Sequence, residues 1–251
     1  YNFCRTLDDI VDNDNKLEVK KEIFLKFKKD FMNKNPNNQI INDMWTIVNS
    51  ENISKKIVID LFDGVETDLE KKVEITSKKD LLVYSYRVAG TVGLMMSKIL
   101  KVNNKESLRG AIDLGIAMQL TNIARDVCED NKRNRKYIQS DFSSIKETIY
   151  ESEIFYQKSF NSMSAIPLRS RFSVIVARRV YKKIGHFILK QKSTENYNKA
   201  GKIYVSIFRK IIETFLSIFD FIKLLFVKEI NYDNHINHSI LEEKINFDER
   251  I

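Results

Sequence analysis

The chain has 251 residues, of which 43% are hydrophobic and 30% are charged, and its formal net charge is +8. These values exclude a disordered protein and suit one large domain, or at most two small ones, with a substantial core. Two cysteines, Cys4 and Cys128, exclude a disulfide scaffold, and neither the cysteines nor the pair His235 and His238 predicts a zinc site.

Helix-breaking residues are scarce along the whole sequence. The chain contains 7 Gly and 2 Pro, and no proline lies between Pro36 and Pro167. Long stretches with a hydrophobic period of 3.6 residues accompany this scarcity, so the sequence predicts an all-α fold.

The first predicted helix carries an acidic stripe. Residues three or four apart share one face of a helix, which aligns Tyr1, Arg5, Asp8 and Asp12 among apolar residues that are typical of a core. Tyr1 is not an initiator methionine and falls within the helical pattern, so we expect further N-terminal helices upstream of it.

Amphipathic segments follow at about 17–33, 39–49 and 54–69, and Ser77 then begins a helix with capping-box spacing to Asp80. Within that helix, Gly90 and Gly93 each cost about 1 kcal/mol relative to alanine. The narrow face around Gly93 therefore needs a reason: either another helix packs closely there, or an apolar ligand fills the space. The sequence by itself favours close packing.

A helix predicted from about Glu106 carries a second acidic stripe, formed by Gln119, Asn122, Asp126 and Asp130. Basic residues follow it directly, over 131–137. A basic surface loop is ordinary, but beside a metal-loaded cavity these residues would supply counter-charges for phosphate oxygens.

One pair of carboxylates a helical turn apart is ordinarily a solvated face. Two such stripes, each with an arginine and apolar neighbours, favour two helices that face each other across one cavity with four carboxylates. Buried like charges are unfavourable unless cations neutralise them, so the pattern predicts bound metal. Carboxylate and amide oxygens favour Mg²⁺, with Mn²⁺ as the alternative.

Helices are further predicted at about 145–164, 168–192 and 201–227, and we expect one domain over 1–230 and a polar tail over 231–251. The last helix is strongly apolar, but Glu213, Asp220 and Lys223 interrupt it, so it is too short and too charged to predict a membrane span. We expect it to pack in the core, with interfacial membrane contact as the alternative.

Twelve Lys and Arg residues lie between Ala165 and Lys210, against the single acid Glu195. Such a band attracts nucleic acid, an anionic membrane or a diphosphate, unless its lysines merely solvate the backs of helices. Because no recognised nucleic-acid-binding motif accompanies it, we predict no nucleic-acid partner and expect peripheral contact with an anionic membrane.

Four ordered motifs cover the chain from Tyr1 to Tyr137. They read Tyr1-x-x-Cys4-Arg5-x-x-Asp8-x-x-x-Asp12, Asp63-Gly64-Val65-Glu66-x-Asp68-Leu69, Tyr84-x-Tyr86-x-Val88-Ala89-Gly90-Thr91-Val92-Gly93, and Gln119-Leu120-Thr121-Asn122-Ile123-x-Arg125-Asp126-x-x-Glu129-Asp130 with Arg133-x-Arg135-x-Tyr137. In these motifs the chain resembles the squalene/phytoene synthase family, which condenses isoprenyl diphosphates head to head (1′-1). The resemblance continues more weakly to about Lys210.

The resemblance implies a single-domain, all-α isoprenoid-synthase bundle around a central cavity. It implies that Mg²⁺ is bound by Asp8, Asp12, Asn122, Asp126 and Asp130. It implies that the diphosphate is contacted by Arg5, Arg125, Arg135 and Tyr137. It also implies a hydrocarbon tunnel lined by Tyr86, Val88, Ala89, Gly90, Gly93 and Gln119. The four carboxylates would then act in catalysis, and Tyr86 or Tyr84 would stabilise a carbocation by cation–π contact, unless these tyrosines are structural.

The motif wording is most similar to that of bacterial-type phytoene synthases. It implies condensation of two geranylgeranyl diphosphates to phytoene through a cyclopropyl diphosphate, without NADPH. The alternatives are a squalene or dehydrosqualene synthase that uses farnesyl diphosphate, and a non-catalytic family member that acts as an assembly factor. All four carboxylates are present, which disfavours the last alternative. We expect the protein in the cytoplasm or on the cytoplasmic face of a membrane.

Overall fold

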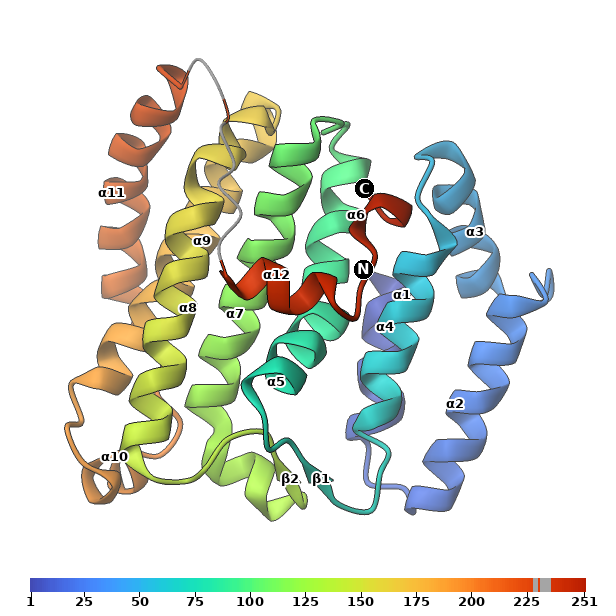
Figure 1. The fold of residues 1–251 in the computed structure, drawn as a ribbon, viewed down its shortest axis with the longest axis horizontal. Helices are drawn as coiled ribbons and strands as arrows, with labels where there is room; N and C mark the ends of the chain where they lie inside the picture. The colour runs from blue at the N-terminus through green and yellow to red at the C-terminus, as the bar shows by residue number, and fades with distance from the viewer. Residues whose placement is uncertain (228–229, 231–235) are drawn as a thin grey trace.

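The structure is a computed structural model, and it describes residues 1–227, 230 and 236–251. Helices that run side by side form most of the molecule (Figure 1). Their bounds are α1 (Asn2–Asp12), α2 (Leu17–Met32), α3 (Gln39–Ser50), α4 (Lys55–Thr67), α5 (Lys78–Ser85), α6 (Thr91–Ile99), α7 (Lys105–Lys132), α8 (Phe142–Ser162), α9 (Leu168–Leu189), α10 (Thr194–Ala200), α11 (Ile207–Leu225) and α12 (Ile236–Glu242). The prediction of an all-α bundle is confirmed.

Polar side chains begin several helices at the positions that the sequence suggests. Ser77 accepts a hydrogen bond from the backbone N–H of Asp80 at the start of α5, and Asn104 accepts one from Ser107 at the start of α7. Each cap satisfies a backbone donor that has no partner within the helix. The long helix α7 is thereby fixed at one end, and it continues without interruption through the second acidic stripe.

Helix α7 lies at the centre of the bundle and packs against α6, α8 and α9. Two glycines let it approach the preceding segment closely. A Cβ atom added at Gly93 would lie 2.3 Å from the carbonyl oxygen of Ala111, and one added at Gly115 would lie 2.3 Å from that of Ala89. These distances are too short for any side chain, so the glycine-thinned face is a site of close helix packing.

Between α5 and α6 the chain forms a π-helical turn over Tyr86–Gly90. Such a turn inserts one extra residue into the helical repeat and shifts the phase of the side chains that follow. The direction in which the Tyr86 side chain points is therefore set by this turn and not by the 3.6-residue period of the flanking helices α5 and α6.

Besides two short 3₁₀ helices, Met163–Ala165 and Phe247–Glu249, the described chain contains two short strands. Strand β1 (Val73–Glu74) pairs in parallel with β2 (Arg135–Lys136), with Val73 opposite Arg135. The pair lies at the lower end of the bundle in Figure 1. It joins the loop after α4 to the loop after α7, and so it brings Arg135 beside Asp68.

The C-terminal segment is part of the bundle and not a separate tail. Helix α12 packs against α5, and Leu241, Ile245 and Phe247 are buried in the main core. His238 is fully buried and its Nε2 lies 2.6 Å from Asp113 Oδ1, whereas His235 lies outside the described residues. The boundary that we expected at residue 231 is therefore corrected: residues 236–251 cover one side of the helical domain.

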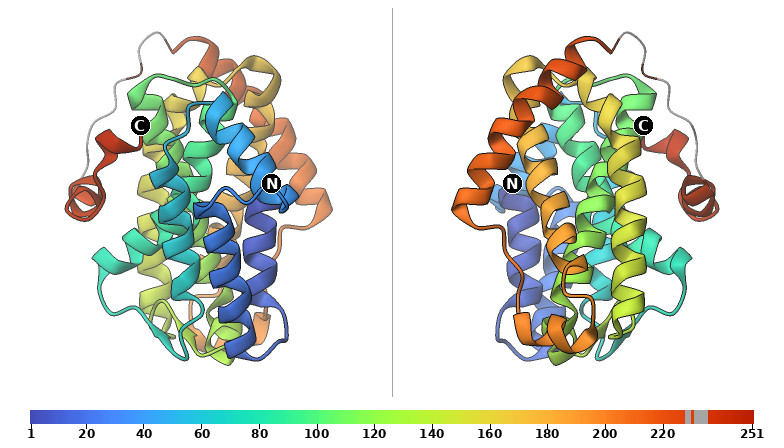
Figure 2. Two further views of the ribbon diagram at one scale, coloured as in Figure 1. Left: turned by 90° about the vertical axis from the view of Figure 1, so that its right-hand side faces the viewer. Right: turned by 90° about the vertical axis from the view of Figure 1, so that its left-hand side faces the viewer.

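The orientation of α11 also differs from expectation. We expected its apolar side to pack in the core, but the buried side carries Glu213, Ser217 and Asp220, while large apolar residues such as Phe215 and Phe219 are exposed. Of the helices that the structure describes, none is long and apolar enough to cross a membrane. The views in Figure 2 place α11 at the periphery of the bundle.

Candidate active site

The two acidic stripes face one polar cavity of about 450 Å³. On α1, the buried residues Leu7 and Val11 fix the roll of the helix, and this places Asp8 and Asp12 on the cavity wall. On α7, buried residues on the other faces similarly leave one line of polar side chains toward the cavity. That line consists of Gln119, Asn122, Asp126 and Asp130.

Arginines already neutralise part of this acidic wall. Arg133 and Arg135 both contact Asp12 Oδ1, at 2.9 and 3.1 Å. Arg125 donates two hydrogen bonds to the neighbouring Asp126, at 2.8 and 2.5 Å. Arg133 and Arg135 lie where the basic loop was expected to meet the acidic stripes, because the β1–β2 pair holds that loop against the cavity.

Arg5, which we expected to contact diphosphate, occupies a different position. Its guanidinium forms an ion pair with Asp9 at 2.9 Å, and both side chains are 59% exposed. In this structure Arg5 is thus held on the outer surface of α1 by a partner one helical turn away.

Asp68 is an acidic group of this site for which the sequence predicted no role. Its side chain is partly buried and accepts hydrogen bonds from the hydroxyls of Tyr84, at 2.8 Å, and Tyr137, at 2.5 Å. The two rings stack with their centroids 4.7 Å apart. Burial raises the pKa of the Asp68 carboxyl, while Arg135 and the two hydroxyls oppose that shift. The sequence signal that could have identified Asp68 is its position in the second motif, whose other acidic residues, Asp63 and Glu66, do not line this cavity.

Tyr137 lines the cavity as expected, but its hydroxyl group already donates a hydrogen bond to Asp68. Lys202 also reaches this cavity, with its Nζ 2.6 Å from Glu129 and 3.4 Å from Asp126. No sequence pattern places Lys202 beside α7, because the loop that carries it follows α10 and meets α7 only through tertiary packing.

Two carboxyl groups of the cavity have pKa values above the usual range of an aspartate. Burial, followed by repulsion from Asp126, raises the pKa of Asp130 to about 7. Burial, followed by repulsion from Asp12, also raises the pKa of Asp8. Both shifts have the causes expected where carboxylates crowd together away from water.

The donor set fits a hard divalent cation. The Oδ1 atom of Asn122 is buried without a hydrogen-bond partner, between the carboxylates of α1 and α7. Such an orphaned oxygen beside carboxyl groups with raised pKa is suited to bind Mg²⁺. Over residues 1–227, 230 and 236–251, no three acidic, histidine or cysteine side chains are already gathered as an ion site.

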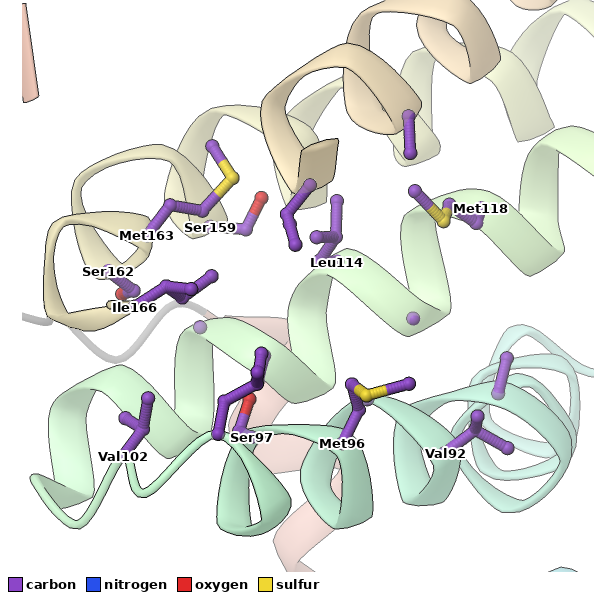
Figure 3. A pocket seen from close by; sticks show the side chains of 18 of the residues that line it. Val92, Met96, Ser97, Val102, Leu114, Met118, Ser159, Ser162, Met163 and Ile166 are labelled. Atoms are coloured by element: carbon purple, nitrogen blue, oxygen red, sulfur yellow. The ribbon is translucent and has the colours of Figure 1, made fainter. Parts of the chain in front are cut away.

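The polar cavity opens into an apolar cavity of about 630 Å³, and Asp8, Val88 and Asn122 line both. Figure 3 shows the apolar cavity between α6, α7 and the end of α8, running from Val92 and Met118 at one end to Val102 and Ile166 at the other. It is a long channel with carboxylates at one end, a shape that suits an amphiphile with an anionic head and an apolar chain.

Three of the expected tunnel residues line this channel, namely Val88, Ala89 and Gly93. The glycine face thus borders the channel as well as packing closely on α7, so the two explanations of its glycines are compatible. Gln119 lines the polar cavity instead, at the acidic end.

Tyr86 and Gly90 require a correction. The Tyr86 side chain is fully buried on the other side of the wall, where its hydroxyl donates to Asp60 Oδ2 at 2.9 Å and its ring packs on Phe247. A Cβ atom at Gly90 would meet Tyr86 and Ile112. Both residues support the wall from behind, because the π-helical turn directs them away from the channel.

Comparison with known proteins agrees with this geometry. The family model for squalene/phytoene synthases matches residues 1–144. The chain is similar to the 15-cis-phytoene synthase of Pantoea ananas, with 26% identity over 74% of this chain and 70% of that protein. It is also similar to the 15-cis-phytoene synthase of Paracoccus sp., with 33% identity over 51% of this chain, and it spans about half of that relative's length, 47%.

Solved structures show the same fold. A dehydrosqualene synthase in complex with ligand superimposes with a TM-score of 0.69 and 25% identity, over 87% of this chain and 83% of that one. A squalene synthase from Alicyclobacillus acidocaldarius superimposes with a TM-score of 0.61 and 16% identity, over 75% and 80%, which bears on the fold alone. With the motifs, the cavity and these similarities in agreement, the chain belongs to the squalene/phytoene synthase family, a family of prenyltransferases.

Proposed function

We propose that this protein condenses two prenyl diphosphates head to head, and that its substrates are two geranylgeranyl diphosphates, which it converts to phytoene through a cyclopropyl diphosphate. The observation that carries this proposal is the junction of the two cavities. Asp8 and Asn122 stand where the polar cavity meets the channel, so a diphosphate among the carboxylates directs its chain into the apolar space.

The proposed cofactor is Mg²⁺, held by Asp8, Asp12, Asn122, Asp126 and Asp130. When bound, the ion offsets the negative charge that develops on the diphosphate as the allylic C–O bond breaks. The fit of Asn122 Oδ1 and of the carboxyl groups with raised pKa supports this assignment.

The arginines have a second partner available in the same cavity. Arg125 and Arg135 now bind carboxylates, and a diphosphate offers them oxygens with more charge. We propose that both exchange their carboxylate partner for phosphate when substrate enters, which also frees the carboxylates to bind metal. Lys202, beside Asp126, is placed to join them.

The channel walls and the stacked tyrosines act on the hydrocarbon part of the reaction. Apolar residues such as Val88, Val92 and Met118 exclude water from the allylic cation and thereby prevent its hydrolysis. Tyr84 faces the polar cavity and is the tyrosine available to stabilise the cation, since Tyr86 is turned away.

A second candidate function has support of its own. Similarity to a dehydrosqualene synthase structure favours an enzyme that uses farnesyl diphosphate and makes a C30 product. The two candidates share the metal site and differ in the length of chain that the channel accepts.

The test is incubation of the full chain with Mg²⁺ and either farnesyl or geranylgeranyl diphosphate, each with and without NADPH, followed by mass spectrometry of the products. We expect phytoene from the C20 substrate without NADPH, and none when a chelator removes the metal. A C30 product formed in preference supports the second candidate, and a strict requirement for NADPH indicates a squalene-type enzyme. A folded protein that converts neither substrate contradicts both and favours an assembly factor.

We also propose that the protein works in contact with an anionic membrane on its cytoplasmic face, because its proposed substrates and product carry prenyl chains that partition into lipid. Only part of the basic band is available for such contact. Arg171 and Arg178 are buried and donate to backbone carbonyls, and Arg179 pairs with Glu213 and Asp220. These three arginines therefore face other helices, whereas Lys210 at the end of the band is exposed.

A further inference from the structure

The outward face of α11 is a continuous apolar surface. Six large apolar side chains on it are exposed at spacings of three or four residues, and these are Phe208, Ile211, Phe215, Phe219, Ile222 and Phe226. Phe208, Phe215 and Phe219 expose 73%, 65% and 64% of their surface. The helix lies at the edge of the bundle in Figure 1, where neighbouring segments leave this face uncovered.

The inward face of the same helix is polar except near its end, where Leu224 is buried and Phe221 packs against the core. Glu213, Ser217 and Asp220 are buried there, and Arg179 of α9 contacts both acids, at 3.0 and 2.7 Å. A surface helix of a globular protein normally turns its apolar side inward. Here ion pairs hold the helix to α9, and its apolar side is left for another environment.

The charge distribution identifies that environment. Both acids of α11 are buried and paired, so the exposed face carries no carboxylate, while Lys210 and Lys223 are exposed near the two ends of the helix. An apolar stripe bordered by lysines matches a lipid surface with anionic head groups, because the lysine stems lie along the apolar layer while their ammonium groups reach the phosphates. A second copy of this chain would bring lysines against lysines, which disfavours self-association.

We propose that α11 lies in the plane of an anionic bilayer interface, with Phe208, Phe215 and Phe219 among the acyl chains and Lys210 and Lys223 at the head groups. This inference specifies the surface for the membrane contact proposed above, and it rests on the geometry of α11 and not on the reaction. Helix α9 links this surface to the channel, since α9 carries α11 and also lines the channel with Val174 and Tyr181.

The experiment is flotation of the full chain with vesicles of phosphatidylcholine alone or mixed with phosphatidylglycerol. The double variant Phe215→Gln with Phe219→Gln should lower the bound fraction about tenfold or more, since two large apolar anchors are lost. The matched control is Tyr150→Gln with Ile154→Gln, an exposed apolar pair of the same spacing on α8, and it should bind as the native chain does. Lys210→Gln with Lys223→Gln should remove the preference for phosphatidylglycerol.

A spectroscopic readout makes the test independent of the reaction. Phe215→Trp should show a blue-shifted emission with anionic vesicles, and brominated lipids should quench it, while the native Trp45, which hydrogen-bonds Phe31 O within the bundle, is not quenched. Turnover of detergent-dispersed substrate should be equal in the native chain and the α11 variants, so loss of binding and loss of the proposed function are distinguishable. Equal binding by the native chain and the Phe215/Phe219 variant overturns the inference. So does a native dimer that this variant dissociates.

Discussion

Arg250 and Asp60 lie 190 residues apart in the chain and form a two-point ion pair, with 2.6 Å between Arg250 Nε and Asp60 Oδ2 and 3.0 Å between Arg250 Nη2 and Asp60 Oδ1. The same carboxylate accepts a hydrogen bond from the hydroxyl of Tyr86. The last residues of the described chain are thereby attached to the π-helical turn, whose next residues, Val88 and Ala89, line the channel.

Arg250→Ala should lower the free energy of unfolding by about 3 kcal/mol, because it leaves the buried Asp60 carboxylate without its cation. Chemical denaturation followed by circular dichroism measures this loss. Lys105→Ala is the matched control, since Lys105 pairs with Asp248 of the same segment at 3.6 Å and both side chains are largely exposed. That change should cost less than about 1 kcal/mol. Equal losses in the two variants would show that the C-terminal segment contributes no buried ion pair to stability.

Asp8→Asn and Asp130→Asn should abolish turnover while the fold persists. Both carboxyls have a raised pKa, so the folded chain already tolerates their neutral forms. Asp126→Asn should also abolish turnover, but at some cost in stability, because Arg125 loses its partner. Asp9→Asn is the control, an exposed neighbour that pairs with Arg5 and should retain activity. Full activity of Asp8→Asn in a product assay would contradict the metal assignment.

Added bulk along the channel should separate its two ends. Ser97→Phe, near the end farthest from the carboxylates, should reduce use of the C20 substrate more than that of the C15 substrate, because it shortens the space for the chain terminus. Ala89→Phe, near the carboxylates, should reduce both alike. The measurement is kcat/KM for each substrate in each variant. The same ratio of C20 to C15 use in both variants would indicate that the chain does not extend along this channel.

Gly93→Ala should destabilise the fold by about 1–3 kcal/mol, because its Cβ would overlap the carbonyl oxygen of Ala111 and backbone atoms cannot move aside easily. Gly90→Ala should cost less, since its Cβ would meet side-chain atoms at 3.0 and 3.2 Å. A thermal melt of both variants gives the comparison. An order of stability opposite to this one would mean that α6 and α7 do not approach each other at Gly93. Because a Cβ atom at Gly93 would already overlap the backbone of Ala111, Gly93→Phe is unsuitable as a probe of the chain length that the channel accepts.

The raised pKa of Asp130, about 7, makes both stability and metal binding depend on pH. An unfolded aspartate has a pKa of about 3.9, so between about pH 4 and 7 the folded state binds more protons and this group's contribution to stability falls as pH rises. Binding of Mg²⁺ requires the ionised form, so its affinity should increase through about pH 7. Calorimetric titration with Mg²⁺ and inorganic diphosphate measures the increase. In Asp130→Asn it should be absent, and an unchanged pH profile in that variant would assign the proton to another group.

Much of the site follows from the sequence because it lies on two regular helices. The 3.6-residue period alone places Asp8 with Asp12, and Asp126 with Asp130, and apolar neighbours fix which side of each helix is buried. The scarcity of glycine and proline similarly determines the all-α class. Val88, Ala89 and Gly93 could be placed on the channel because the motif covers them directly.

The tertiary structure decided the contacts that the helical period of the sequence does not predict. The π-helical turn shifts the phase of its side chains and turns Tyr86 from the channel toward Asp60. Asp68 becomes part of the site only because β1 and β2 pair. The polar composition of the C-terminal segment conceals Arg250, whose charge is neutralised by a residue far away in the chain. In α11 the sequence defined an amphipathic helix, but the side that faces inward was set by Arg179 on α9, since a buried carboxylate is stable only where a cation meets it.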